Sequence, residues 1–142
     1  MRPGEIHFRR NFYADPDTGE MRGKYLLVLA HLPGGDIVFR LLTSRPHGRP
    51  ETPRCYHGDP YPSFFLGIPG GSLDRPTWVD LRGSDDYDSA SALRDGKQGI
   101  LTPTSTLDAL TLREVLACVA AANDTTRLQE RAIRDQMALT RT

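Results

Sequence analysis

The pattern of apolar and polar positions predicts strands in the first two thirds of the chain and helices in the last third. Short segments either alternate between polar and apolar residues or are continuously apolar, and both patterns are typical of strands. Such segments cover residues 5–9, 24–30, 37–43, 63–68, 77–81 and 99–102. The clearest pair is 24–30 with 37–43, because Pro33, Gly34 and Gly35 between them favour a tight reversal. The sequence therefore predicts an antiparallel hairpin whose first strand is covered on both faces.

Two helices are predicted near the C-terminus, over about residues 107–122 and 126–140. Each contains a capping box, in which a threonine hydroxyl and a Glu or Gln three residues later satisfy free backbone amides. The two boxes are Thr111 with Glu114 and Thr126 with Gln129. The acidic segment 83–97 and the proline-rich segment 45–62 are predicted to be loops. Strands followed by helices indicate a single α+β domain over residues 1–142, with a small curved sheet.

Charge and hydropathy exclude several classes of protein. The 142 residues carry 18 basic and 18 acidic side chains, so overall charge does not favour nucleic-acid binding. Basic residues nevertheless outnumber acidic ones over residues 1–58, which leaves room for a local basic face. No apolar run approaches the roughly 20 residues of a membrane-spanning helix, and the N-terminus lacks the apolar region of a signal peptide. We therefore expect a cytoplasmic protein with no membrane association.

The cysteines give no recognisable metal pattern. Cys55 and Cys118 cannot supply a four-ligand zinc site unaided, and Cys55-Tyr56-His57 is too compact for a known motif. A Cys55 thiol activated by His57 is the alternative to an unreactive loop cysteine. The acidic run 85–88 lacks the glycine and distal glutamate of a calcium loop. We expect two free thiols, no bound metal and no cofactor.

Residues able to bind a phosphate gather at the open end of the predicted hairpin. Lys24 begins one strand, Thr43 and Ser44 end the other, and antiparallel pairing brings these ends together. Further basic side chains could flank this rim, and a loop with aromatic rings could cover it. These residues are Arg9, Arg22, Arg45, Tyr56, His57 and Tyr61. Because cations bind phosphates and rings stack on unpaired bases, the pattern suits phosphodiester recognition, the alternative being an ordinary polar rim.

Several motifs resemble the MazF/PemK-type toxins of type II toxin–antitoxin systems. Residues 3–6 are similar to the Gly-acidic-apolar start of that family, and a glycine-containing loop then leads into an apolar strand beginning at Lys24. Residues 37–44 resemble its apolar strand ending in Thr-Ser/Gly, and residues 76–81 resemble its Pro-x-x-Val-x-Leu strand. The resemblance covers roughly residues 3–122, in short patches.

The resemblance implies a small SH3-like curved β-barrel of about five to seven mostly antiparallel strands, with two C-terminal helices, in a homodimer. It also implies a metal-independent endoribonuclease that cleaves single-stranded RNA and is neutralised by a cognate antitoxin. In such enzymes the ribose 2′-hydroxyl attacks its own phosphorus while an arginine and a threonine assist. Thr43 takes the threonine position, whereas Lys24 stands at the arginine position and Arg22 could serve instead. The residues then expected to bind RNA are Arg9, Ser44, Arg45, Tyr56 and His57.

Two other interpretations remain open. The same barrel could bind nucleic acid or a peptide without catalysis, because Lys24 lacks the bidentate fork of arginine and the 45–62 loop is unusually long. The apolar segment 64–66 could instead contact a partner protein, although such a segment is more often part of a core.

Overall fold

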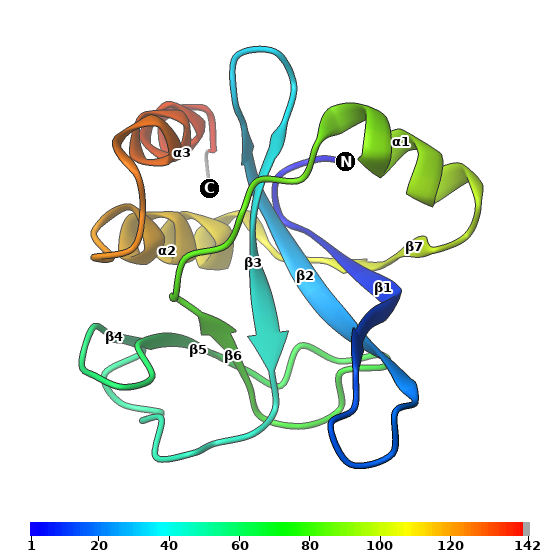
Figure 1. The fold of residues 1–142 in the computed structure, drawn as a ribbon. Coiled ribbons are helices and arrows are strands. Elements are labelled where there is room, and N and C mark those ends of the chain that lie inside the picture. Colours follow the sequence, from blue (N-terminus) through cyan, green and yellow to red (C-terminus); the bar gives the residue numbers. More distant parts are fainter. Residues whose placement is uncertain (141–142) are drawn as a thin grey trace.

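The computed structural model describes residues 1–140, which form an α+β fold of seven strands and three helices (Figure 1). The strands are β1 (Glu5–Ala14), β2 (Met21–His31), β3 (Ile37–Thr43), β4 (Cys55–Tyr56), β5 (Ser63–Gly67), β6 (Thr77–Asp80) and β7 (Leu101–Thr106). The helices are α1 (Ser89–Lys97), α2 (Ala109–Ala120) and α3 (Arg127–Leu139). None of these three helices has the length and apolar character needed to cross a bilayer.

All neighbouring strands of the sheet are antiparallel, in the order β4-β5-β6-β3-β2-β1-β7. The predicted α+β class and the hairpin of β2 with β3 are confirmed, with Leu26 opposite Leu41. The sheet is open, because β4 and β7 are its two edges, so it does not close into a barrel. The central strand β3 pairs with β2 on one side and with β6 on the other (Figure 1).

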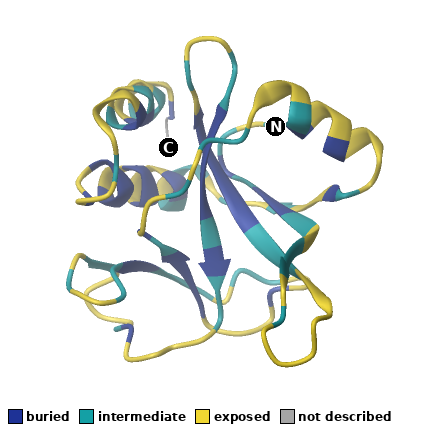
Figure 2. Ribbon diagram, viewed as in Figure 1, coloured by how far each residue is buried: buried dark blue, intermediate teal, exposed yellow. Residues whose placement is uncertain are grey.

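Strand β2 is buried on both faces, as its continuous apolar sequence predicts. Leu26, Leu27, Val28 and Leu29 have no exposed surface. The ribbon coloured by burial shows a buried stretch along this strand (Figure 2). Leu27 and Leu29 belong to the cluster that α2 and α3 cover, whereas Leu26 and Val28 belong to a second cluster together with Ala92 of α1. Alternate residues of one strand therefore join two separate hydrophobic clusters, and truncation of any of them to alanine costs about 2–5 kcal/mol.

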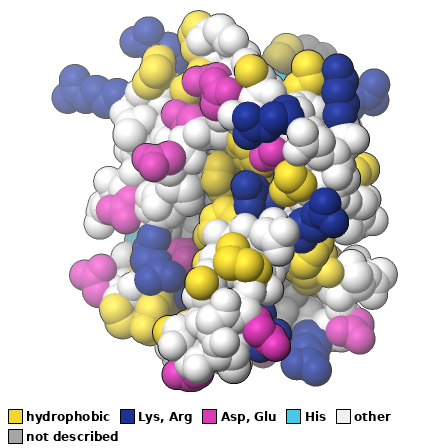
Figure 3. Space-filling model, turned by 45° about the vertical axis from the view of Figure 1, so that its right-hand side comes forward, with side chains coloured by type: hydrophobic (Ala, Val, Ile, Leu, Met, Phe, Trp, Pro, Cys, Tyr) yellow, Lys and Arg dark blue, Asp and Glu magenta, His cyan; other side chains and the backbone are white. Residues whose placement is uncertain are grey.

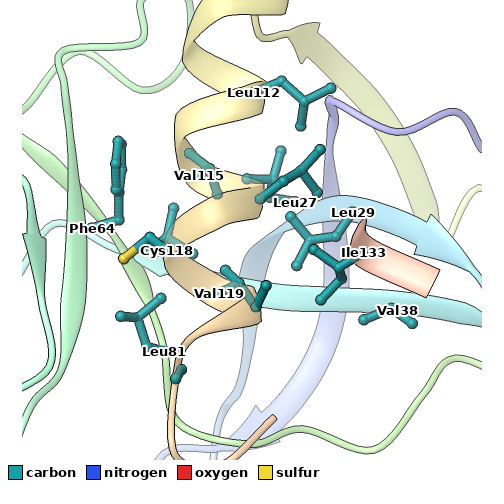
Figure 4. Packing of buried hydrophobic residues seen from close by; sticks show 14 of the residues in the cluster. Leu27, Leu29, Val38, Phe64, Leu81, Leu112, Val115, Cys118, Val119 and Ile133 are labelled. Atoms are coloured by element: carbon teal, nitrogen blue, oxygen red, sulfur yellow. The ribbon is translucent and has the colours of Figure 1, made fainter. Parts of the chain in front are cut away.

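The larger cluster lies between the sheet and the two C-terminal helices. Val115 and Val119 of α2 and Ile133 of α3 are fully buried there (Figure 4). The capping box predicted for α3 is confirmed, because the Thr126 hydroxyl accepts from the backbone amide of Gln129 and the Gln129 side chain accepts from that of Thr126, both at 3.1 Å.

The cap predicted for α2 was wrong. The helix begins at Ala109, and Asp108 is its N-cap residue. The Asp108 carboxylate accepts a 2.8 Å hydrogen bond from the backbone amide of Thr111. Aspartate is as good an N-cap as threonine and lies one turn earlier, so Thr111 falls inside the first turn instead of preceding it.

The segment predicted to be an acidic loop contains helix α1. Asp88 caps this helix by accepting a 2.9 Å hydrogen bond from the backbone amide of Ser91, which lowers the pKa of Asp88. Only Ala92 and Asp95 of the helix are buried, and Asp95 accepts a hydrogen bond from the hydroxyl of Tyr87. Such a short polar helix lacks the apolar stripe on which sequence patterns depend.

The prediction of two free thiols was also wrong. Cys55 and Cys118 form a disulfide across 63 residues of sequence, with their Cα atoms 5.7 Å apart. Cys118 lies on the buried side of α2, on the side toward Phe64 (Figure 4), and β5 places Phe64 directly opposite Cys55. Tertiary packing brings the two cysteines together, so the local sequence around either one carries no sign of the pairing.

Candidate functional site

A cavity of about 390 Å³ lies at the end of the β2–β3 hairpin that is farther from its turn. Continuing the register of Leu26 and Leu41 places Lys24 opposite Thr43. Both residues line this cavity, which we call the hairpin pocket. The structure therefore brings together the two residues that strand pairing predicts to meet.

The hairpin pocket concentrates positive charge in a chain with no net charge. One carboxylate and four basic side chains line it, namely Asp80 and Lys24, Arg45, Arg49 and Arg82. On the molecular face shown in Figure 3, basic and acidic side chains are interspersed. The local excess of basic side chains around the pocket favours anion binding even though the chain has no net charge.

Lys24 is a half-buried cation with no carboxylate attached to it. Its ammonium forms no ion pair with any of residues 1–140 and lies 5.6 Å from the centre of the Tyr13 ring. Burial lowers the pKa of Lys24 and so does the nearby Arg45, whereas Asp80 raises it. An anionic ligand would supply the partner that the protein does not.

Thr43 places a hydroxyl on the same wall. Its Oγ1 accepts a 3.2 Å hydrogen bond from the backbone amide of Arg45. That bond fixes the oxygen but leaves the hydroxyl proton free for a ligand. The end of β3 is itself held by pairing of Thr43 with Trp78 of β6.

Asp80 orients an arginine on the opposite side of the pocket. Its carboxylate accepts from Nε of Arg82 at 3.0 Å and from Nη2 at 2.7 Å. Burial raises the pKa of Asp80, but the hydrogen bonds from Arg82 outweigh this effect and the pKa is lowered overall. Asp80 is therefore a weak base, and its evident role is to position Arg82.

Arg49 is a buried guanidinium with an unused donor. It is 7% exposed, and its Nη1 donates a 2.7 Å hydrogen bond to the carbonyl of Arg45. Its Nε finds no partner among residues 1–140. The guanidinium lies 4.8 Å from the centre of the Tyr61 ring, and Arg82 lies 5.3 Å from the same ring. The buried charge of Arg49 is therefore held at the pocket by one backbone carbonyl and one aromatic ring.

The long loop that carries Arg49 is anchored to the sheet. The indole nitrogen of Trp78 donates a 2.9 Å hydrogen bond to the carbonyl of Pro50, and Trp78 packs on Phe65 at 5.2 Å between ring centres. Phe64 is buried in the core, so only part of the apolar 64–66 segment faces outward. The loop is thereby fixed over the end of the hairpin.

Not every residue predicted for this site lies in it. Arg45 lines the pocket, and Ser44 lines a neighbouring cavity, where its hydroxyl is 3.2 Å from that of Thr77. Arg22 is exposed and bonded to Asp15 at 3.4 Å, and it does not line the pocket.

The remaining predicted residues lie elsewhere. Arg9 faces Lys24 across the β1–β2 ladder, but its guanidinium donates to the hydroxyl of Tyr87 at 3.2 Å. Tyr56 and His57 follow Cys55 at the β4 edge and do not line the pocket.

Sequence reasoning missed Arg49, Asp80, Arg82 and His47 as pocket residues. The Asp80-x-Arg82 spacing at the end of a predicted strand is compatible with a local ion pair. This spacing was the one sequence signal that could have drawn attention to these two residues. Arg49 and His47 have no comparable signal, because only the folded course of the loop brings them over the hairpin. No family model, curated protein or solved structure matches this chain. Its resemblance to MazF/PemK-type toxins therefore rests on the sequence motifs described above.

Proposed function

We propose that the hairpin pocket binds the backbone of single-stranded RNA and cleaves it without a metal ion, as MazF/PemK-type toxins do. The observation that carries this proposal is the half-buried, unpaired Lys24 beside the free hydroxyl proton of Thr43. The three arginines of the pocket add the positive charge that a phosphodiester requires. The same proposal includes an SH3-like fold, a homodimer and a cognate antitoxin, because the resemblance to MazF/PemK-type toxins implies all three.

The proposed reaction is an internal transfer of the phosphoryl group. The 2′-hydroxyl attacks phosphorus, the bond to the 5′-oxygen breaks, and the products are a 2′,3′-cyclic phosphate and a 5′-hydroxyl. The proton lost by the 2′-oxygen passes to a solvent water, and the departing 5′-oxygen receives a proton from an acid of the pocket. Lys24 suits the second role, since its lowered pKa makes the ammonium a stronger acid than an ordinary lysine.

The other groups of the pocket would stabilise the charge that develops on phosphorus. Thr43 can donate its hydroxyl proton to a non-bridging oxygen, and the guanidinium groups of Arg49 and Arg82 add positive charge beside the same phosphate. His47 is exposed at the pocket, 5.7 Å from Tyr61 between ring centres, where it offers an aromatic face to an unpaired base.

A cleavage assay in excess EDTA tests the proposal. Purified protein is incubated with end-labelled single-stranded RNA of mixed sequence, and the fragment ends are mapped. We expect discrete fragments that end in 2′,3′-cyclic phosphate, and no cleavage when the mapped nucleotide carries a 2′-deoxyribose. Intact RNA after long incubation, with no binding, would contradict the proposal.

Binding without cleavage would support the second candidate function, a non-catalytic nucleic-acid-binding module. Two departures from the family's pattern favour this candidate. Lys24 stands where the family has an arginine, and Arg22, which could replace that arginine, is paired with Asp15. The affinity would then fall steeply with salt, because each basic side chain that contacts a phosphate releases counterions.

RNA affinity is expected to fall as the pH rises, and the fall should occur at a lower pH than it would if an ordinary lysine bound the phosphate. Lys24 binds phosphate while protonated, so affinity is present below its lowered pKa and weakens as the pH rises through that value. The affinity for an uncleavable deoxyadenosine oligonucleotide can be measured by fluorescence anisotropy between about pH 7 and 10. This range covers roughly the three pH units below the pKa of an ordinary lysine. Lys24→Arg should keep its affinity over this range, whereas identical pH profiles for both proteins would exclude Lys24 as the titrating group.

A further inference from the structure

Three side chains with metal-binding atoms converge at the edge of the sheet, away from the hairpin pocket. Cys55 and His57 come from β4 and the residue after it, and Cys118 comes from α2. The two sulfur atoms and a ring nitrogen of His57 all lie within 4.8 Å of one another. His57 Nε2 is 3.2 Å from the sulfur of Cys55. The disulfide between the cysteines is therefore one state of a three-residue cluster.

Contacts independent of the disulfide hold this cluster in place. Arg54, the residue before Cys55, forms a 3.0 Å ion pair with Glu114 of α2 and donates to the carbonyl of Phe65 at 3.0 Å. Its guanidinium also lies 4.9 Å from the centre of the Phe64 ring. Cys118 is buried in the main hydrophobic cluster. These contacts of Arg54 do not involve the sulfur atoms, so reduction of the disulfide does not itself remove them.

We propose that the reduced protein binds one Zn²⁺ ion through Cys55, Cys118 and His57, and that the disulfide form cannot bind it. Two thiolates and an imidazole are a known zinc donor set, with sulfur ligands at about 2.3 Å and nitrogen at about 2.0 Å. After reduction, the sulfur atoms of Cys55 and Cys118 need only move apart to the spacing of two ligands on a tetrahedral zinc ion. His57 is exposed, which leaves the fourth position of the ion open to solvent.

The chemistry separates into two balanced steps. A dithiol reductant gives two electrons and two protons to the Cys55–Cys118 bond, so that two thiols form on the protein and the reductant becomes a disulfide. Zn²⁺ then displaces both thiol protons to the buffer, and no electrons move in this step. The oxidised protein has no thiolate to offer, so zinc affinity reports the redox state of the pair.

Zinc titration of the reduced and oxidised proteins tests the inference without RNA. Metal-free protein is reduced with a phosphine, the reductant is removed, and Zn²⁺ is titrated against a chromophoric chelator. We expect one equivalent per reduced chain, no binding to the oxidised chain, and a marked loss of affinity in Cys118→Ser, which lacks one of the two thiolate ligands. Co²⁺ in place of Zn²⁺ should give thiolate-to-metal charge-transfer absorption in the reduced wild type but not in the oxidised protein.

His57→Ala decides between a three-residue site and simple dithiol binding. It changes an exposed side chain, so folding is expected to survive, and His31→Ala is the matched control because His31 is exposed and bonded to the carbonyl of Met1. Weaker zinc binding by His57→Ala, but not by His31→Ala, supports the site. Equal affinity for the two histidine variants, or no zinc bound by the reduced wild type, would overturn it.

Discussion

RNA cleavage by Lys24→Ala is expected to be at least about a hundredfold slower than by the wild type, because one preorganised charge donor commonly contributes that much. The ammonium is half-buried and has no carboxylate partner in the described part of the chain, so water screens it poorly. Thr43→Ala should lose a similar factor, because the adjacent Ser44 hydroxyl lies against that of Thr77 in the neighbouring cavity and is not positioned to replace it. Single-turnover rates on the mapped RNA site measure both effects.

Conservative replacements and a distant lysine provide the controls. Thr43→Ser should retain most of the activity by keeping the hydroxyl, and Lys24→Arg should retain part of it by keeping the charge. Lys97 is the second lysine of the sequence and lies exposed on α1, so Lys97→Ala should cleave at the wild-type rate. Undiminished cleavage by the Lys24→Ala, Thr43→Ala double variant would reject the assignment of these residues.

Arg40→Ala is expected to reduce the free energy of unfolding by about 2–5 kcal/mol, the range for truncating a large buried side chain. Arg40 has no exposed surface, and it donates to the carbonyl of Phe39 at 2.8 Å, to Thr125 at 3.3 Å and to Gln129 at 3.3 Å. Truncation leaves a cavity in β3 and removes a donor from buried acceptors beside α3. Urea unfolding followed by the fluorescence of Trp78, the one tryptophan of the sequence, measures the change.

Two further variants help to interpret the effect of Arg40→Ala. One keeps most of the side-chain volume without the charge, and the other removes an exposed arginine as a control. Arg40→Met keeps much of the volume and should cost less than Arg40→Ala. Arg134→Ala removes an exposed arginine that pairs with Glu130 at 2.8 Å, and it should cost no more than about 0.5 kcal/mol. If Arg40→Ala were as mild as Arg134→Ala, Arg40 would not be the structural link between β3 and the C-terminal helices.

The elements with the strongest local signals could be predicted from the sequence. The apolar run of β2, the turn residues after it and the capping box of α3 each determine local structure within a few residues. For the same reason Lys24 and Thr43 could be placed together, because hairpin register follows from the turn and the hydrophobic pattern.

The features that the sequence did not reveal depend on contacts between distant segments. Helix α1 has too few buried apolar residues to show a stripe, and the disulfide joins cysteines 63 residues apart. Arg49 reaches the hairpin pocket because the loop is anchored by Trp78. In the sequence, Arg40 is one polar residue within an apolar strand. Its burial depends on helices from the C-terminal end of the chain that pack over it.

The two margins of the open sheet constrain how copies of this chain can associate. One margin is a strand of two residues, β4, and the other is β7, in which Pro103 lacks the amide hydrogen that a further strand would need. Neither margin offers a long ladder of free backbone groups. Edge-to-edge pairing of two subunits is therefore disfavoured at both margins, and so is growth into extended β-fibres.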